Sequence, residues 1–148
     1  MRYYDYDSFK ADTLTLVAQI RAYNPDALLP IARGGLTLSH AIAHALDIRA
    51  VLPINAILYE KEQKGDSCDV FNVPDLKGYE RILILDDIVD SGETLKRVQE
   101  CLFSRYSNKR FKTASLFYKR TAAILPEFSV HEATQWIDFF WERDFLTK

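Results

Sequence analysis

The stretch ILILDDIVDSGET, residues 82–94, decides the fold of this 148-residue chain. Its first four residues are all apolar and run directly into two adjacent carboxylates, Asp86 and Asp87. A short, continuously apolar run of this kind is typical of a parallel strand that is buried on both faces. Because ligands of open α/β sheets collect at the carboxyl ends of such strands, we expect both carboxylates at a binding site.

The second half of the stretch predicts a phosphate site beside these carboxylates. A helix-like pattern, residues 95–102, follows the small and acidic residues Asp90, Ser91, Gly92, Glu93 and Thr94. The N-terminus of a helix offers backbone N–H groups and a positive dipole end to phosphate. Carboxylates beside phosphate repel it, so they are expected to bond sugar hydroxyls or a divalent cation. A ribose that bears phosphate satisfies both requirements.

The rest of the chain alternates predicted strands and helices. We expect helices at 6–23, at 36–46 and from the motif to about residue 103, and strands at 27–32, 50–59, 71–73 and 113–118, with a last extended segment at 134–140. Pro30 favours an edge or an end for its strand. This alternation predicts an α/β fold, a mostly parallel sheet flanked by helices, in one domain over residues 1–148.

Composition indicates a small cytoplasmic enzyme. Hydrophobic residues make up 48% of the chain, which excludes a disordered protein, and the net charge of −2 offers no footprint for nucleic acid. No apolar run approaches the roughly 18 residues of a membrane span, and the acidic, aromatic N-terminus does not resemble a signal peptide. Cys68 and Cys101 stand in unrelated contexts, so neither a disulfide framework nor a metal site is expected.

Residues 82–94 resemble the phosphoribosyl-pyrophosphate motif of the type I phosphoribosyltransferases. The competing families require other strings: a P-loop ATPase needs GxxxxGK[ST], which the chain lacks. A haloacid-dehalogenase-type phosphatase needs Asp-x-Asp after the strand, where this chain has the run from Asp86 to Asp90, DDIVD. The resemblance implies that Asp86 and Asp87 hold ribose hydroxyls and a hydrated Mg²⁺, with Asp87 at the metal. It also implies that residues 90–94 bind the 5′-phosphate. Glu93 stands where the xanthine-guanine type of this family usually has glycine, so its carboxylate is expected to point away.

Two further segments acquire roles through this resemblance. Arg33 and Gly34 follow the strand at 27–32 and correspond to the family's pyrophosphate-binding loop, which often holds a non-proline cis peptide, here Ala32–Arg33. The charged segment 59–69 corresponds to a flexible lid that closes over the reacting centre and excludes water. Within that lid the candidate pyrophosphate ligands are Tyr59, Lys61 and Lys64, among which the sequence does not choose.

The base pocket is the most specific part of the resemblance. Lys119 ends a predicted strand, and the run Trp136-Ile137-Asp138 through Glu142 lies near the C-terminus, as in bacterial xanthine-guanine phosphoribosyltransferases. By position, Lys119 would contact a 6-oxo group, Trp136 would stack on the purine, and Ile137 would offer backbone groups, forming a small C-terminal hood over the base. Trp141 or Phe140 would add backbone groups to the same edge.

The chemistry implied is displacement of pyrophosphate from phosphoribosyl pyrophosphate by a purine nitrogen, with Asp90 accepting the proton of the imidazole nitrogen. Guanine, xanthine and hypoxanthine remain open as substrates. So do a phosphoribosyltransferase for another base and a non-catalytic, nucleotide-sensing regulator on the same fold. The family assembles as dimers or tetramers, and exposed aromatics at Tyr3, Tyr4 and Tyr6 would permit such an interface.

Overall fold

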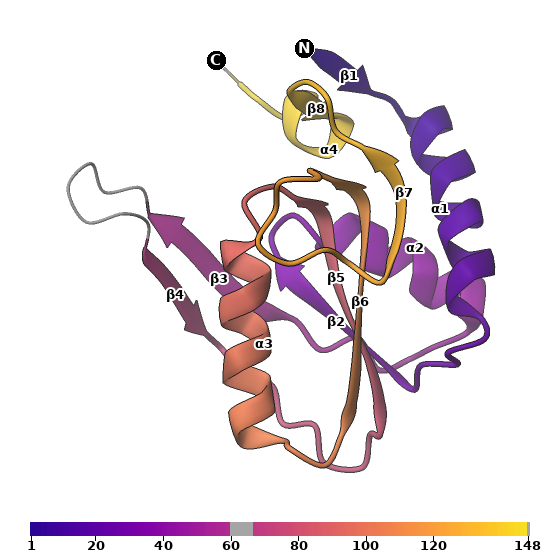
Figure 1. The fold of residues 1–148 in the computed structure, drawn as a ribbon. Coiled ribbons are helices and arrows are strands. Elements are labelled where there is room, and N and C mark those ends of the chain that lie inside the picture. The colour runs from indigo at the N-terminus through magenta and orange to yellow at the C-terminus, as the bar shows by residue number, and fades with distance from the viewer. Residues whose placement is uncertain (60–66, 148) are drawn as a thin grey trace.

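The residues that the computed structural model describes, 1–59 and 67–147, form a six-stranded main sheet, a two-stranded sheet and flanking helices (Figure 1). The elements are β1 (Arg2–Tyr4), α1 (Tyr6–Ile20), β2 (Ala27–Ala32), α2 (Leu36–Leu46), β3 (Ile54–Tyr59), β4 (Ser67–Phe71), β5 (Arg81–Val89), α3 (Glu93–Arg105), β6 (Arg110–Tyr118), β7 (Phe128–Glu132), β8 (Ile137–Phe139) and α4 (Phe140–Arg143). The main sheet has the order β4-β3-β2-β5-β6-β7. Because the β3–β4 pair alone is antiparallel, the predicted mostly parallel α/β sheet is confirmed.

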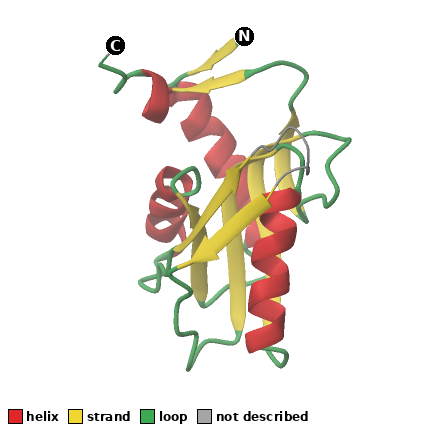
Figure 2. Cartoon of the chain, turned by 90° about the vertical axis from the view of Figure 1, so that its left-hand side faces the viewer, coloured by secondary structure: helices red, strands yellow, loops and turns green. Residues whose placement is uncertain are grey.

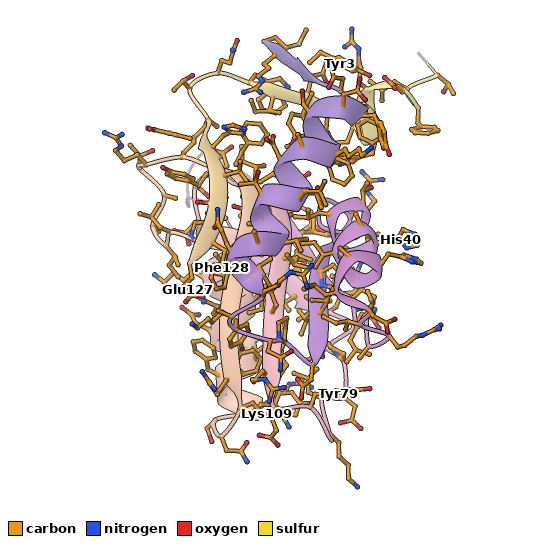
Figure 3. The ribbon with its side chains drawn as sticks, turned by 90° about the vertical axis from the view of Figure 1, so that its right-hand side faces the viewer. Tyr3, His40, Tyr79, Lys109, Glu127 and Phe128 are labelled. Atoms are coloured by element: carbon orange, nitrogen blue, oxygen red, sulfur yellow. The ribbon has the colours of Figure 1, made fainter. Side chains whose placement is uncertain are left out.

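Strand β5 is buried on both faces, as its apolar sequence predicts. Leu83 and Leu85 join the core under α1 and α2, whereas Ile82 and Ile84 join the core under α3. Figure 2 shows α3 on one side of the sheet, and Figure 3, from the opposite side, shows α1 and α2 crossing the strands. Since all four side chains are fully buried, truncating any one to alanine would cost about 2–5 kcal/mol of stability.

The register of the parallel strands brings three loops to one edge of the sheet. Strand β2 pairs with β5 from Ala27 opposite Ile82, and β5 pairs with β6 as far as Val89 opposite Tyr118. The carboxyl ends of β2, β5 and β6 therefore lie side by side. The segments that follow them carry the residues singled out in the sequence.

The expectation that Pro30 marks an edge strand or a strand end is wrong, because β2 lies inside the main sheet between β3 and β5. On the β3 side, Leu28 exchanges hydrogen bonds with the segment at Ala50 and Leu52, and regular pairing resumes only at Ile31 opposite Ile54. Pro30 falls in this gap, where a missing backbone N–H costs the sheet nothing.

Strands β3 and β4 form an antiparallel hairpin, with Tyr59 opposite Ser67. The bounds of the strand predicted at 71–73 are wrong, since the strand that leaves this segment, β4, spans Ser67–Phe71 and includes part of the segment expected as a loop. Residues 60–66 are outside the described part of the chain, and with them Lys61 and Lys64 and most of the expected lid.

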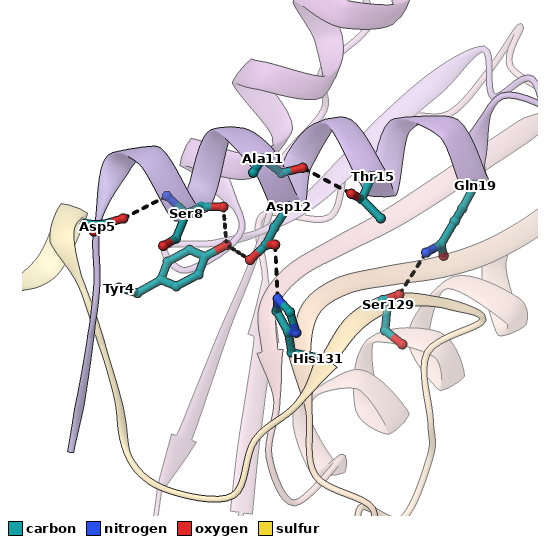
Figure 4. Close-up of polar contacts among 9 residues, drawn as sticks. All are labelled: Tyr4, Asp5, Ser8, Ala11, Asp12, Thr15, Gln19, Ser129 and His131. Atoms are coloured by element: carbon teal, nitrogen blue, oxygen red, sulfur yellow. Dashed lines mark hydrogen bonds and ion pairs between the residues drawn. The ribbon is translucent and has the colours of Figure 1, made fainter.

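Strands β1 and β8 and helix α4 form a small layer at the carboxyl end of the main sheet, which we call the hood (Figure 1). Tyr4 anchors it: its fully buried ring packs edge-on against Phe117, with ring centroids 5.1 Å apart. The Tyr4 hydroxyl donates to Asp12 Oδ2 of α1 at 2.6 Å, and His131 Nε2 of β7 lies 3.0 Å from Asp12 Oδ1 (Figure 4). The expectation that Tyr4 is exposed is therefore wrong.

The remaining boundaries differ modestly from those predicted. Helix α1 ends at Ile20 rather than at residue 23, and the extended segment expected at 134–140 narrows to β8 before α4 begins. Strands β1 and β7 had not been predicted. None of the helices in the described ranges has the length and apolar character needed to cross a lipid bilayer.

Candidate active site

Two carboxylates lie at the carboxyl end of β5, facing the edge where the loops converge. Asp87 is 6% exposed and Asp86 is half-buried. The Asp87 N–H donates to Asp86 Oδ1 at 2.9 Å, and the Ile88 N–H donates to Asp87 Oδ1 at 2.7 Å. Burial and the Asp87 charge raise the pKa of Asp86 well above its usual range, and burial followed by the Glu142 charge raises that of Asp87 to about 6.

These raised pKa values show that the acid pair is held at an electrostatic cost. A cation, or hydroxyl groups that donate hydrogen bonds, would relieve that cost. Within the described residues, no three His, Cys, Asp or Glu side chains converge to hold a metal by themselves.

The loop between β5 and α3 borders a cavity of about 280 Å³. The lining residues from β5, the loop and the start of α3 are Asp86, Ile88, Val89, Asp90, Ser91, Gly92, Thr94 and Leu95. Gly92 caps α3 with a φ of +83°, and a Cβ there would lie 2.9 Å from the backbone nitrogens of Ala123 and Ile124. Glycine is therefore required both by the turn and by the crossing loop. Glu93 is absent from this lining set, in agreement with a carboxylate that points away.

The loop after β2 touches the acid pair directly. A Cβ on Gly34 would lie 2.8 Å from both carboxylate oxygens of Asp87 and 2.9 Å from Asp86 Oδ1, so glycine alone permits this approach. The Ala32–Arg33 peptide bond is cis, which confirms the expectation. Arg33 is exposed and, with Gly34 and Glu142, lines a cavity of about 530 Å³ beneath the end of the chain.

A third cavity, of about 190 Å³, lies between the main sheet and the hood. Its lining residues are Asp87, Ile88, Asp90, Lys119, Gln135, Trp136, Ile137, Phe139 and Glu142. The Lys119 ammonium lies 2.8 Å from Asp90 Oδ1 across this cavity. Trp136 is 69% exposed, whereas Ile137 is buried. The Trp136 carbonyl accepts the N–H of Arg2 at 2.8 Å, so β1 fixes the backbone of the cavity wall.

Shared residues join the three cavities around the acid pair. Ile88 and Asp90 line both the β5–α3 cavity and the hood cavity, and Glu142 lines both the hood cavity and the Arg33 cavity. Of the candidate site residues in the described ranges, the three cavities are lined by Asp86, Asp87, Asp90, Ser91, Gly92, Thr94, Arg33, Gly34, Lys119, Trp136 and Ile137, whereas Glu93 and Tyr59 line none of them. A further cavity of about 570 Å³ lies at the opposite end of the sheet, between Arg21, Arg49 and Tyr79. It contains none of the motif residues.

Sequence reasoning missed some of the lining residues. Phe139 lines the hood cavity in place of Phe140, which packs on Tyr6 and Phe9, and Trp141 faces the Arg33 cavity. The side chain of Glu142 had been given no role, although it lines two cavities and acts on the pKa of both acids. Glu142 is visible in the sequence as an acidic residue beside the aromatic run, but the direction of its side chain depends on α4.

Comparisons with known proteins agree with this geometry. Residues 2–145 match a family model described as a phosphoribosyl transferase domain. The chain is 31% identical over 146 residues to a xanthine-guanine phosphoribosyltransferase of Cereibacter sphaeroides, covering 93% of this chain and 84% of that protein. It is 32% identical over 121 residues to the Roseobacter denitrificans protein of the same name, covering 73% and 66%. A solved Helicobacter pylori xanthine-guanine-hypoxanthine phosphoribosyltransferase superposes with a TM-score of 0.90 at 38% identity, covering 97% and 94%.

Proposed function

The chain belongs to the phosphoribosyltransferase family, and we propose that it transfers the 5-phosphoribosyl group of phosphoribosyl pyrophosphate to a 6-oxopurine, releasing pyrophosphate and a nucleoside 5′-monophosphate. The observation that carries this proposal is the hood cavity. Lys119 and the exposed Trp136 line this cavity together with Asp87 of the acid pair. The relatives named for guanine and xanthine, and the solved structure named also for hypoxanthine, support the 6-oxopurine class.

The ribose and its phosphate have complementary partners in the β5–α3 segment. Asp86 and Asp87 accept hydrogen bonds from the ribose hydroxyls, an interaction that relieves their buried charge. The 5′-phosphate occupies the cavity of about 280 Å³, where the N-terminus of α3 and the hydroxyls of Ser91 and Thr94 bind it. Gly92 and Glu93 contribute backbone N–H groups.

Asp86 and Asp87 also fit a hydrated Mg²⁺ that arrives with the substrate, because paired, desolvated carboxylates favour a hard cation with oxygen ligands. Asp87 is the residue we assign to the metal, through its hydration shell. Bound there, Mg²⁺ would supply Lewis-acid neutralisation of the charge that develops on pyrophosphate. Arg33 and the backbone of Gly34 bind the pyrophosphate from the adjoining loop.

The purine lies in the hood cavity. Lys119 donates to its 6-oxo group, Trp136 stacks on its ring and Ile137 offers backbone groups to the opposite edge. An adenine enzyme would need an acceptor at the position of the 6-amino group. Since Lys119 has donors and no acceptor, the pocket favours 6-oxopurines over adenine.

In the chemical step, the bond between ribose C1′ and the pyrophosphate oxygen breaks while a purine imidazole nitrogen bonds to C1′. Positive charge develops on the ribose, where the carboxylates of Asp86 and Asp87 stabilise it. Asp90, at the mouth of both the phosphate and the base cavities, accepts the proton that leaves the imidazole.

The function is tested by steady-state pyrophosphate release from phosphoribosyl pyrophosphate and Mg²⁺ with guanine, xanthine, hypoxanthine or adenine offered singly. We expect release with the 6-oxopurines, and release with adenine alone would reassign the pocket. We propose that residues 1–148 act as one catalytic domain that carries this activity.

We also propose that the enzyme is a homodimer or homotetramer. The hairpin supports an interface, since Ile57, Tyr59 and Phe71 are 42–46% exposed and project from the same face of the β3–β4 pair. Sedimentation velocity of the wild type and of Phe71→Ser tests this: a monomer in both, or an unchanged oligomer in the variant, would remove that face from the interface.

A further inference from the structure

The ammonium of Lys119 and the carboxylate of Asp90 form an ion pair inside the hood cavity. Lys119 Nζ lies 2.8 Å from Asp90 Oδ1, and both side chains are about half exposed. Among the described residues that line this cavity, Lys119 carries the one positive charge, facing Asp87, Asp90 and Glu142. The ammonium is therefore held on one of the three carboxylates, the one that we assign to proton transfer.

The fold itself sets this pairing. Strands β5 and β6 pair in register up to Val89 opposite Tyr118, and the Lys119 N–H donates to the Val89 carbonyl at 2.8 Å. Lys119 and Asp90 are thus the first residues beyond two neighbouring strand ends. Their backbones are fixed side by side, so the ion pair forms without any ligand.

We propose that this ion pair is a substrate-operated latch: the 6-oxo group of the base draws Lys119 away from Asp90, and only then is Asp90 free to act as the base. This inference rests on the proposed function and names how the same site selects its substrate. The balance is simple. The imidazole N–H bond breaks, an O–H bond forms on Asp90, and the Lys119 ammonium keeps its proton while it exchanges a carboxylate oxygen for the 6-oxo oxygen.

The latch discriminates between purines in turnover as well as in binding. A 6-amino group is a donor and offers the ammonium no lone pair comparable to that of a carbonyl, so adenine leaves Lys119 on Asp90. A purine that lacks a 6-substituent does the same. With such bases Asp90 stays paired with Lys119, so the transfer of the imidazole proton to Asp90 is slowed.

The test compares two bases in the wild type and in Lys119→Met. Guanine has the 6-oxo group, and 2-aminopurine has the same ring nitrogens and 2-amino group without it. With guanine, the variant loses the contact, and kcat/KM falls by roughly 10- to 100-fold. With 2-aminopurine, the variant removes the latch, and kcat rises by about two- to fivefold, the range set by the strength of a half-exposed ion pair. A rise for one base with a fall for the other is not produced by a structural defect.

Arg120→Met is the matched control, because Arg120 forms a neighbouring ion pair with Glu132 at 2.9 Å outside the cavity. It is expected to change neither rate. Lys119→Gln provides a second variant, and the affinity for phosphoribosyl pyrophosphate, measured by calorimetry, should be equal in all four proteins.

If the wild type does not turn over guanine at all, the proposed function fails. If it does, and 2-aminopurine turnover in both Lys119 variants is unchanged, lower or undetectable, the latch alone is overturned.

Discussion

Replacing Asp87 with asparagine should stabilise the protein while it disables the site. Asp87 is 6% exposed, and its pKa is raised from 3.8 to about 6. A shift of about two pKa units corresponds to roughly 3 kcal/mol against the folded, ionised state, at about 1.4 kcal/mol per unit. Asparagine keeps the shape and the oxygen that accepts the Ile88 N–H, but its amide donors need partners at a cost of about 1 kcal/mol. We therefore expect a gain of about 1–3 kcal/mol.

The sign of the pH dependence follows from the raised pKa. Because the folded state binds the Asp87 proton more tightly than the unfolded chain does, wild-type stability falls as pH rises from about 4 to 6 and is then constant with respect to this group. Asp87→Asn lacks this loss. Its advantage over the wild type should be full at pH 8 and should shrink toward pH 4.

Urea unfolding of both proteins at intervals between pH 4 and pH 8 measures the difference directly. Asp75→Asn, an exposed carboxylate that accepts the Lys77 N–H, is the control and should match the wild type within about 0.5 kcal/mol. Two results would refute the reasoning that the acid pair is held at an electrostatic cost. One is an Asp87→Asn variant that is less stable than the wild type at pH 8, and the other is a gain in its free energy of unfolding that does not depend on pH.

Four further outcomes are expected. Asp90→Asn should lower kcat far more than it weakens phosphoribosyl pyrophosphate binding, and equal losses would remove Asp90 from the base role. Trp136→Ala should raise the KM for the base about 5- to 100-fold while Trp136→Phe retains most of the affinity, since stacking contributes about 1–3 kcal/mol; equal KM values in both would place the base elsewhere. Gly34→Ala should weaken phosphoribosyl pyrophosphate binding about tenfold or more in calorimetry, because its Cβ would overlap the acid pair. Tyr4→Phe should cost about 1–3 kcal/mol in urea unfolding, as the hydrogen bond to the Asp12 carboxylate is lost; an unchanged midpoint would remove that bond from the anchoring of the hood.

The parts of the fold that could be predicted are those whose signal is local. The bounds of β2 and α2 were predicted to the residue, because an apolar run ends at Ala32, two glycines follow and a helical pattern begins at Leu36. The motif likewise predicted where β5 gives way to α3. Its one inaccuracy is that the acid pair lies within β5, three residues before its end, rather than after it.

The parts that could not be predicted depend on pairing between distant segments. Strand β1 is three residues long, and its partner β8 lies more than 130 residues away, so nothing near Tyr4 in the sequence indicates that its ring is buried. Strand β7 has no fully buried residue and thus no alternating pattern to detect. The residue that caps α1 is hard to predict, because Asp7 and Ser8 suit the N-cap position as well as Asp5 does. In the structure Asp5 is the cap, and its side chain accepts the Ser8 N–H at 2.7 Å.

For the site, the sequence predicted which residues converge but not how they contact one another in the absence of substrate. The convergence of the loops after β2, β5 and β6, which carry Arg33, Asp90 and Lys119, follows from the order of parallel strands. The position of Trp136 against Lys119 depends on the hood. The ion pair between Lys119 and Asp90 does not follow from the strand order, because it depends on the register of β5 against β6.

The most direct measurement is a competition. The enzyme is given phosphoribosyl pyrophosphate and Mg²⁺ with guanine, xanthine, hypoxanthine, adenine and uracil together in equal amounts, and the nucleoside 5′-monophosphates are separated and identified by mass. Products confined to the 6-oxopurines are the result that the hood cavity predicts. Adenine or uracil nucleotides as the main products, or no nucleotide while phosphoribosyl pyrophosphate still binds, would contradict the assignment of Lys119 and Trp136 to a 6-oxopurine.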